Sequence, residues 1–61
     1  TMNEELYSYD KYQGHRIYIT LDNNKYYAEI QWNGTTVKSL SSMNPERLLT
    51  DCKLWVDENG E

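Results

Sequence analysis

The chain has 61 residues, a formal net charge of −4 and a single cysteine, Cys52. A chain this short buries only about 60% of the surface that it exposes when unfolded, so we expect one domain with a thin core. The acidic charge argues against a protein that binds duplex DNA, because lysine and arginine supply most of that affinity. One cysteine excludes a disulfide within these residues, so a partner chain becomes the expected source of extra stability.

Residues 1–11 are acidic and polar, and we expect them to form a partly ordered lead-in. Leu6, Tyr7 and Tyr9 allow two arrangements there, a short strand or side chains that lie on the sheet. Residues 12–61 are predicted to form a single β-β-β-α domain. The expected fold class is α+β: a three-stranded antiparallel meander with one C-terminal helix packed on one face.

Alternation of apolar and polar residues predicts three strands, at about residues 16–21, 26–32 and 35–40. Asn33-Gly34 lies between the last two strands. Both central positions of a two-residue type I′ turn need positive φ, which asparagine tolerates and glycine adopts freely. The dipeptide therefore predicts a hairpin and fixes its register. Asp22-Asn23-Asn24-Lys25 is predicted to be a four-residue turn that closes the first hairpin.

The segment after residue 43 predicts a helix of about eleven to fourteen residues. Asn44 can cap free amide groups, and Pro45 fits the first helical position. Apolar residues then recur at helical spacing and form one stripe: Leu48, Leu49, Cys52, Trp55 and Val56. Asn59-Gly60 predicts the end of the helix. Asp57 and Glu58 disagree with this pattern, because the helix dipole disfavours anions at its carboxyl end.

The two predicted turns indicate which side chains share a face of the sheet. Across the second hairpin the expected pairs are Ile30–Val37, Ala28–Ser39, Glu29–Lys38 and Tyr27–Leu40. Across the first they include Ile17–Ile30, Ile19–Ala28, Tyr18–Glu29 and Thr20–Tyr27. The apolar rows then fall on one face, which we expect to pack beneath the helix: Ile17, Ile19, Leu21, Ala28, Ile30, Trp32 and Val37.

The opposite face of the sheet is the predicted partner-binding surface. Its candidate contact residues are Arg16, Tyr18, Tyr27, Glu29, Lys38 and Leu40. Tyrosine and arginine are enriched in interface cores because they bury much area and keep a polar tip. Two other interpretations stay open: the tyrosines are ordinary strand formers, or the lead-in folds back and covers them. Glu29 and Lys38 are expected to form a cross-strand ion pair of small value.

The sequence thus predicts a non-enzymatic protein-interaction module that binds another protein or itself, with a homodimer as the expected form. The contact is expected on the open sheet face or at the edge of the first or third predicted strand, where backbone groups are unpaired. The alternative is single-stranded nucleic acid on the same face, because aromatic side chains beside arginine and lysine stack on bases. Glu29 and the net charge make nucleic acid the weaker interpretation.

Catalytic and metal-binding motifs are missing from the sequence. Cys52 and His15 suggest a nucleophile and a base, but Cys52 falls on the apolar helix stripe, where a thiol is usually an inert core residue. One cysteine and one histidine without ligand spacing predict no metal, and we expect no cofactor and no small-molecule substrate. No apolar run is long enough to span a membrane, and no signal peptide is recognisable, so a cytoplasmic location is expected.

Tyr26-Tyr27-Ala28-Glu29, which opens the second predicted strand, and Asn44-Pro45-Glu46-Arg47-Leu48-Leu49, which opens the helix, carry a resemblance. Residues 16–58 resemble the first part of HicB-like antitoxin domains. The resemblance implies the β-β-β-α fold and a tendency to bind another protein or itself. The chain also looks like the sheet and last helix of a double-stranded RNA-binding domain, whose basic helix start is replaced here by Asn44-Pro45-Glu46.

Overall fold

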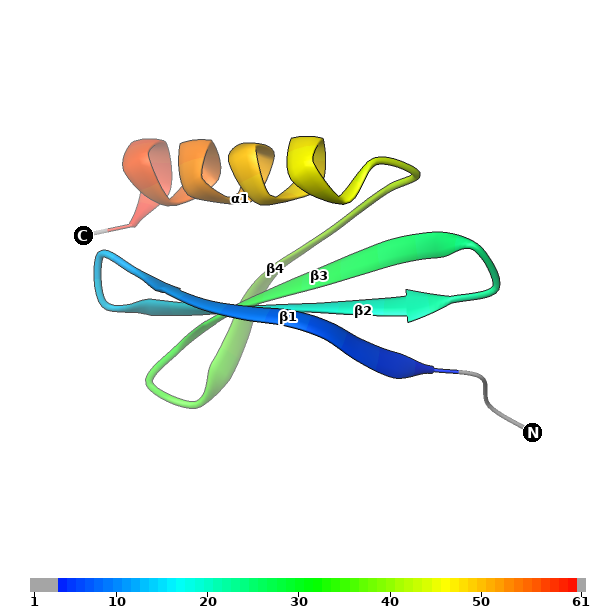
Figure 1. The fold of residues 1–61 in the computed structure, drawn as a ribbon. Coiled ribbons are helices and arrows are strands. Elements are labelled where there is room, and N and C mark those ends of the chain that lie inside the picture. Colours follow the sequence, from blue (N-terminus) through cyan, green and yellow to red (C-terminus); the bar gives the residue numbers. More distant parts are fainter. Residues whose placement is uncertain (1–3, 61) are drawn as a thin grey trace.

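Four strands and one helix form two layers in the computed structural model, which describes residues 4–60 (Figure 1). Their bounds are β1 Glu5–Tyr12, β2 His15–Asp22, β3 Lys25–Trp32, β4 Thr35–Ser42 and α1 Pro45–Asn59. The strands lie in chain order in one antiparallel sheet. Helix α1 lies on one side of this sheet and packs against β2, β3 and β4. The predicted α+β class with an antiparallel sheet and a C-terminal helix is confirmed.

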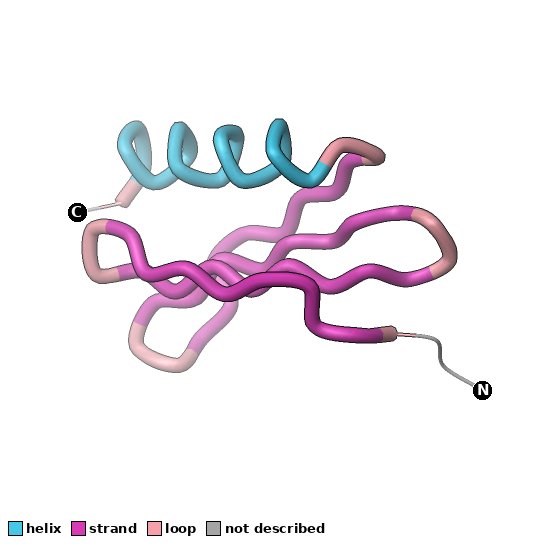
Figure 2. Tube along the Cα trace, in the orientation of Figure 1, coloured by secondary structure: helices cyan, strands magenta, loops and turns pink. Residues whose placement is uncertain are grey.

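Each pair of neighbouring strands is joined by a turn of two residues with positive φ (Figure 2). The turns are Gln13-Gly14 (51° and 77°), Asn23-Asn24 (57° and 68°) and Asn33-Gly34 (56° and 79°). These angles are those of type I′ turns, whose twist matches that of the flanking strands. The predicted Asn33-Gly34 turn is confirmed. The predicted turn at Asp22–Lys25 is confirmed in place and in register, with Leu21 opposite Tyr26, but it is tighter than expected, because Asp22 and Lys25 pair as the last rung of the ladder.

The prediction of three strands is wrong, because residues 5–12 form a fourth strand, β1, which pairs with β2. Of the two arrangements considered for Leu6, Tyr7 and Tyr9, the strand is the one that forms. The alternation of apolar and polar residues is interrupted in β1, because the pairing register shifts between Leu6 and Ser8, where Tyr7 is an extra residue. The first three residues of the predicted lead-in lie outside the described part of the chain.

The register between β2 and β3 is the predicted one, with Ile17 opposite Ile30 and Ile19 opposite Ala28. The register between β3 and β4 starts as predicted, but Val37 is an extra residue that shifts all later pairs. Past this bulge the pairs are Ile30–Lys38, Glu29–Ser39, Ala28–Leu40 and Tyr27–Ser41. The predicted pairs Ile30–Val37, Ala28–Ser39, Glu29–Lys38 and Tyr27–Leu40 are therefore wrong.

The core lies between the sheet and α1. Its buried apolar residues are Ile17, Ile19, Ala28, Ile30, Leu48, Cys52 and Val56. The predicted helix stripe is confirmed, since Leu49 and Trp55 pack against this cluster. Trp32 and Val37 were expected in the core and are 40% and 41% exposed. Leu40 takes a place against the core instead, because the bulge turns it to the helix side.

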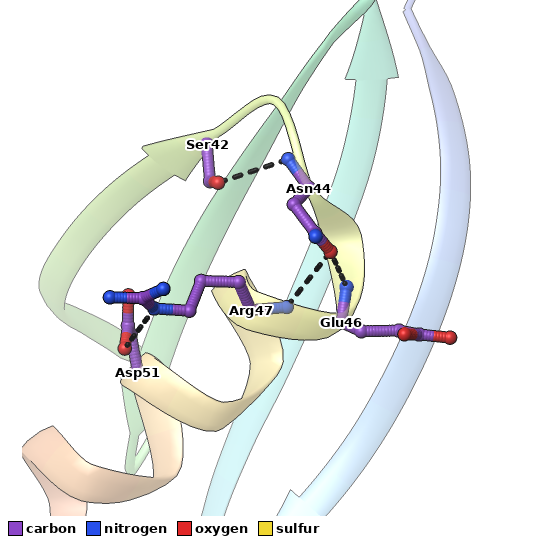
Figure 3. A network of polar contacts seen from close by, with 5 residues as sticks. All are labelled: Ser42, Asn44, Glu46, Arg47 and Asp51. Atoms are coloured by element: carbon purple, nitrogen blue, oxygen red, sulfur yellow. Dashed lines mark hydrogen bonds and ion pairs between the residues drawn. The ribbon is translucent and has the colours of Figure 1, made fainter.

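The two ends of α1 are capped as the sequence predicts. Oδ1 of Asn44 accepts hydrogen bonds from the backbone amides of Glu46 at 3.0 Å and Arg47 at 3.1 Å (Figure 3). Oγ of Ser42 accepts one from the Asn44 amide at 3.0 Å, which holds the cap in place. At the other end, the amide of Gly60 donates to the Val56 carbonyl at 2.7 Å. The helix spans 15 residues, slightly more than predicted.

Candidate functional site

Helix α1 covers one side of the sheet and leaves the other side uncovered (Figures 1 and 2). We call the uncovered side the open face. Strand alternation and the observed registers place these residues on it: Leu6, Tyr9, Lys11, Arg16, Tyr18, Thr20, Asp22, Lys25, Tyr27, Glu29, Gln31, Thr36, Ser39 and Ser41. All four strands therefore contribute to the open face, which carries both aromatic and charged side chains.

Four of the six predicted contact residues lie together on the open face: Arg16, Tyr18, Tyr27 and Glu29. The prediction is wrong for the other two, Lys38 and Leu40. They lie on the helix side of the sheet, because the Val37 bulge pairs them with Ile30 and Ala28. The predicted ion pair between Glu29 and Lys38 is wrong for the same reason. Oε1 of Glu29 instead accepts a long hydrogen bond from Oγ1 of Thr36, at 3.5 Å.

Tyr9 of β1 is the open-face aromatic that the sequence did not identify as a contact residue. It pairs with Tyr18, and their ring centroids are 5.0 Å apart. Tyr27 lies on the next strand at a position diagonal to Tyr18, so three tyrosines extend across β1, β2 and β3. Tyr9 is 47% exposed and Tyr27 is 42% exposed, which leaves much of both rings available for contact. The Lys25 ammonium lies 5.8 Å from the centroid of the Tyr27 ring.

Charge is divided between the two ends of the open face. A shallow depression of about 670 Å³ lies on it, and three carboxylates are among its lining residues: Glu4, Asp22 and Glu29. Lys11 and Arg16 pair with each other at the other end of the strands, beside the Gln13-Gly14 turn. Like charges directly opposite each other on a sheet repel, so the pairing of Lys11 with Arg16 is unfavourable in the isolated chain. The open face thus has a basic end and a depression in which carboxylates outnumber the one nearby cation, Lys25, which lies opposite Asp22.

The candidate nucleophile Cys52 is sealed in the core, with 0% of its surface exposed. Burial raises the pKa of its thiol to about 11, with a smaller contribution from the charge of Asp51. A thiol with this pKa stays protonated at neutral pH and is a poor nucleophile. Within residues 4–60, no group of three or more histidine, cysteine or acidic side chains is arranged to hold a metal ion. In the same residues, no helix is long and apolar enough to cross a membrane.

Comparisons with protein-family models, with curated proteins and with solved structures find no match for this chain. The resemblances to HicB-like antitoxin domains and to double-stranded RNA-binding domains therefore stay predictions.

Proposed function

We propose that this chain is a non-enzymatic protein-interaction module that associates with a second copy of itself through the open face. One observation carries the proposal: the same uncovered surface has Lys11 and Arg16 at one end and, next to them, a depression lined by Tyr18, Tyr27 and three carboxylates. A two-fold interface brings one surface against itself, so it must be self-complementary. A face that carries opposite charges at its two ends meets this requirement when the two copies run in opposite directions.

In such a dimer the two sheets pack face to face with their strands antiparallel. Arg16 of one copy then lies over Asp22 of the second, and Lys11 lies over Glu4. The tyrosines come together at the centre, where water is excluded and aromatic side chains contribute most. The repulsion between Lys11 and Arg16 in the isolated chain is relieved by the carboxylates of the second copy.

The sheet edges support the open face over edge-to-edge pairing. Residues 16–21 were predicted to offer an edge, but β1 covers that position in the sheet. The two strands that do lie at the edges, β1 and β4, each contain a register shift, at Tyr7 and at Val37. Bulges interrupt the row of backbone groups that a strand from another chain needs, and natural sheets use them against edge pairing.

The size of the open face favours a weak dimer. Four strands about 4.8 Å apart and eight residues long at about 3.3 Å each give a sheet area of roughly 500 Å². Stable interfaces bury about 800 Å² of accessible surface per partner, so the face is near the lower limit. We expect dissociation in the micromolar range and a marked dependence on salt, because exposed charges are screened within about 10 Å at 0.1 M salt.

Sedimentation velocity over a concentration series tests the proposal. Arg16→Glu and Asp22→Lys, each alone, are expected to weaken association at least about tenfold, since each places like charges in contact. A mixture of the two variants is expected to recover the wild-type association, because the charges are complementary again. Arg47→Glu is the matched control, because this exposed arginine lies on α1 and pairs with Asp51 there. A chain that stays monomeric at every concentration overturns the proposal.

Single-stranded nucleic acid is the second candidate for the same face. Tyr9 and Tyr18 beside Lys11 and Arg16 support it, since bases stack on aromatic rings next to cations. The three carboxylates of the depression oppose it, because they repel phosphates. A fluorescence titration with an oligothymidylate at low salt distinguishes the two candidates. Salt-sensitive binding that Tyr18→Ala abolishes favours nucleic acid, and a flat titration eliminates it.

A further inference from the structure

A second, smaller concavity lies on the helix side of the sheet, away from the open face. It is about 230 Å³ in volume and is lined by His15, Trp32, Val37, Trp55, Asn59 and Gly60. We call it the tryptophan groove. It is below the roughly 300–1,000 Å³ of sites that hold drug-sized ligands, so it fits one side chain of a larger partner. None of its lining residues carries a formal charge with histidine neutral, and two are tryptophans.

The groove contains a buried histidine with one free acceptor. His15 is 3% exposed, and its Nδ1 lies 3.0 Å from the carbonyl oxygen of Gln13. A carbonyl oxygen only accepts, so Nδ1 carries the proton and Nε2 of the neutral ring is left as an acceptor. No residue in the range 4–60 donates a hydrogen bond to Nε2, and no enclosed side-chain nitrogen or oxygen in this range lacks a partner, so Nε2 is open to solvent at the groove. Nε2 lies beside Gly60 at the groove, so a ligand that donates a hydrogen bond satisfies it.

The surroundings of this acceptor favour a positively charged donor. Trp32 lies with its ring centroid 4.7 Å from that of His15 and stays 40% exposed, and Trp55 lines the same groove. Indole faces attract ammonium and guanidinium groups. The carboxyl end of α1 carries the negative end of the helix dipole. The last turn of α1 contains no basic residue that would offset this potential.

We propose that the tryptophan groove binds a basic side chain, lysine or arginine, presented by a second polypeptide. The side-chain N–H donates to Nε2 of His15, the aliphatic stem packs along Trp32 and Trp55, and the helix end supplies negative potential. The site is separate from the open face and does not depend on self-association.

The test uses three peptides that differ in one side chain: acetyl-Gly-Lys-Gly-amide, its arginine analogue and its norleucine analogue. Titrations are followed by NMR of the indole N–H groups of Trp32 and Trp55 and the amide of Gly60. Both basic peptides are expected to shift these signals, with affinity at least about tenfold above that of norleucine. Equal binding of norleucine overturns the proposal, as do shifts confined to the open-face carboxylates Asp22 and Glu29.

Two variants separate the acceptor from the rest of the groove. A Cβ at Gly60 would lie 2.6 Å from Cε1 and 2.9 Å from Nε2 of His15, so Gly60→Ala blocks the acceptor. His15→Phe keeps a ring against Trp32 and removes the acceptor, and it replaces Gly60→Ala if that variant fails to fold. Each is expected to lower lysine-peptide affinity about tenfold. Leu54→Ala, at an exposed position on α1, is the control. Unchanged affinity in a folded variant contradicts the proposal.

Discussion

Tyr12 and Asp57 are 45 positions apart in the chain, and the hydroxyl of Tyr12 donates a 2.9 Å hydrogen bond to Oδ1 of Asp57. The ammonium of Lys53 lies 5.4 Å from the centroid of the same tyrosine ring. The end of β1 is thereby tied to the last turns of α1. This contact gives Asp57 a partner at a helix end where the dipole alone disfavours a carboxylate.

The Tyr12–Asp57 contact predicts a specific loss of stability at alkaline pH. The hydrogen bond to Asp57 raises the pKa of Tyr12 above its ordinary value, with burial as a smaller cause. A group whose pKa is raised on folding contributes stability that is complete below its unfolded pKa, about 10 for tyrosine, and is lost as pH rises through the folded value. The free energy of unfolding, measured by urea titration across this range, is expected to fall with pH.

Tyr12→Phe is the control for this prediction, since it keeps the ring near Lys53 and removes the hydroxyl. The variant is expected to be less stable than the wild type at neutral pH and to lose less stability at alkaline pH. Identical pH profiles for the two proteins would show that the Tyr12–Asp57 hydrogen bond does not contribute in solution.

The sequence predicted the central part of this fold well, because local signals and global pattern agree there. Asn33-Gly34 can form only a few kinds of turn, and alternation in β2 and β3 then allows one register that keeps Ile17 and Ile30 on one side. The capped start of α1 was equally predictable, since Asn44 and Pro45 each favour a single position in a helix. Arg16, Tyr18, Tyr27 and Glu29 share a face as a consequence.

The two bulges explain most of what the sequence did not predict. An extra residue such as Val37 has no chemical signature, yet it moves every later residue of β4 to the other face. Lys38 and Leu40 were misplaced for this reason. The extra residue at Tyr7 likewise hid β1, and with it Tyr9. The Gln13-Gly14 turn went unpredicted because glutamine is unusual at a position with positive φ.

The Val37 bulge predicts that two substitutions in β4 lower stability by different amounts. Leu40 packs against the core, so Leu40→Ala is expected to cost about 2 kcal/mol, near the low end for leucine in a core. Val37 is 41% exposed, so Val37→Ala is expected to cost under about 1 kcal/mol. Urea denaturation of both variants provides the measurement. The reverse ranking would support the regular register, in which Val37 faces Ile30.

Gln13 predicts a stabilising substitution. Its φ of 51° lies in the left-handed region, which costs most residues energy and which asparagine adopts more readily. Gln13→Asn creates the Asn-Gly sequence that type I′ turns prefer, and the carbonyl that accepts from His15 is retained. The free energy of unfolding is expected to rise by about 0.5–1 kcal/mol. Asn33→Gln is the matched control, because it should lower stability by a similar amount.

We expect the thiol of Cys52 to react only when the protein unfolds. Its side chain is 0% exposed, and burial raises its pKa from an ordinary 9.0 to about 11. Dithionitrobenzoate is therefore expected to label the native protein far more slowly than a denatured sample, at a rate set by opening of the core. The stability that the neutral thiol contributes is complete below pH 9 and is lost as pH rises through about 11. Cys52→Ser is expected to cost roughly 1–3 kcal/mol, because it buries an unpaired hydroxyl. Fast labelling of the native state would contradict the burial of this thiol beneath α1.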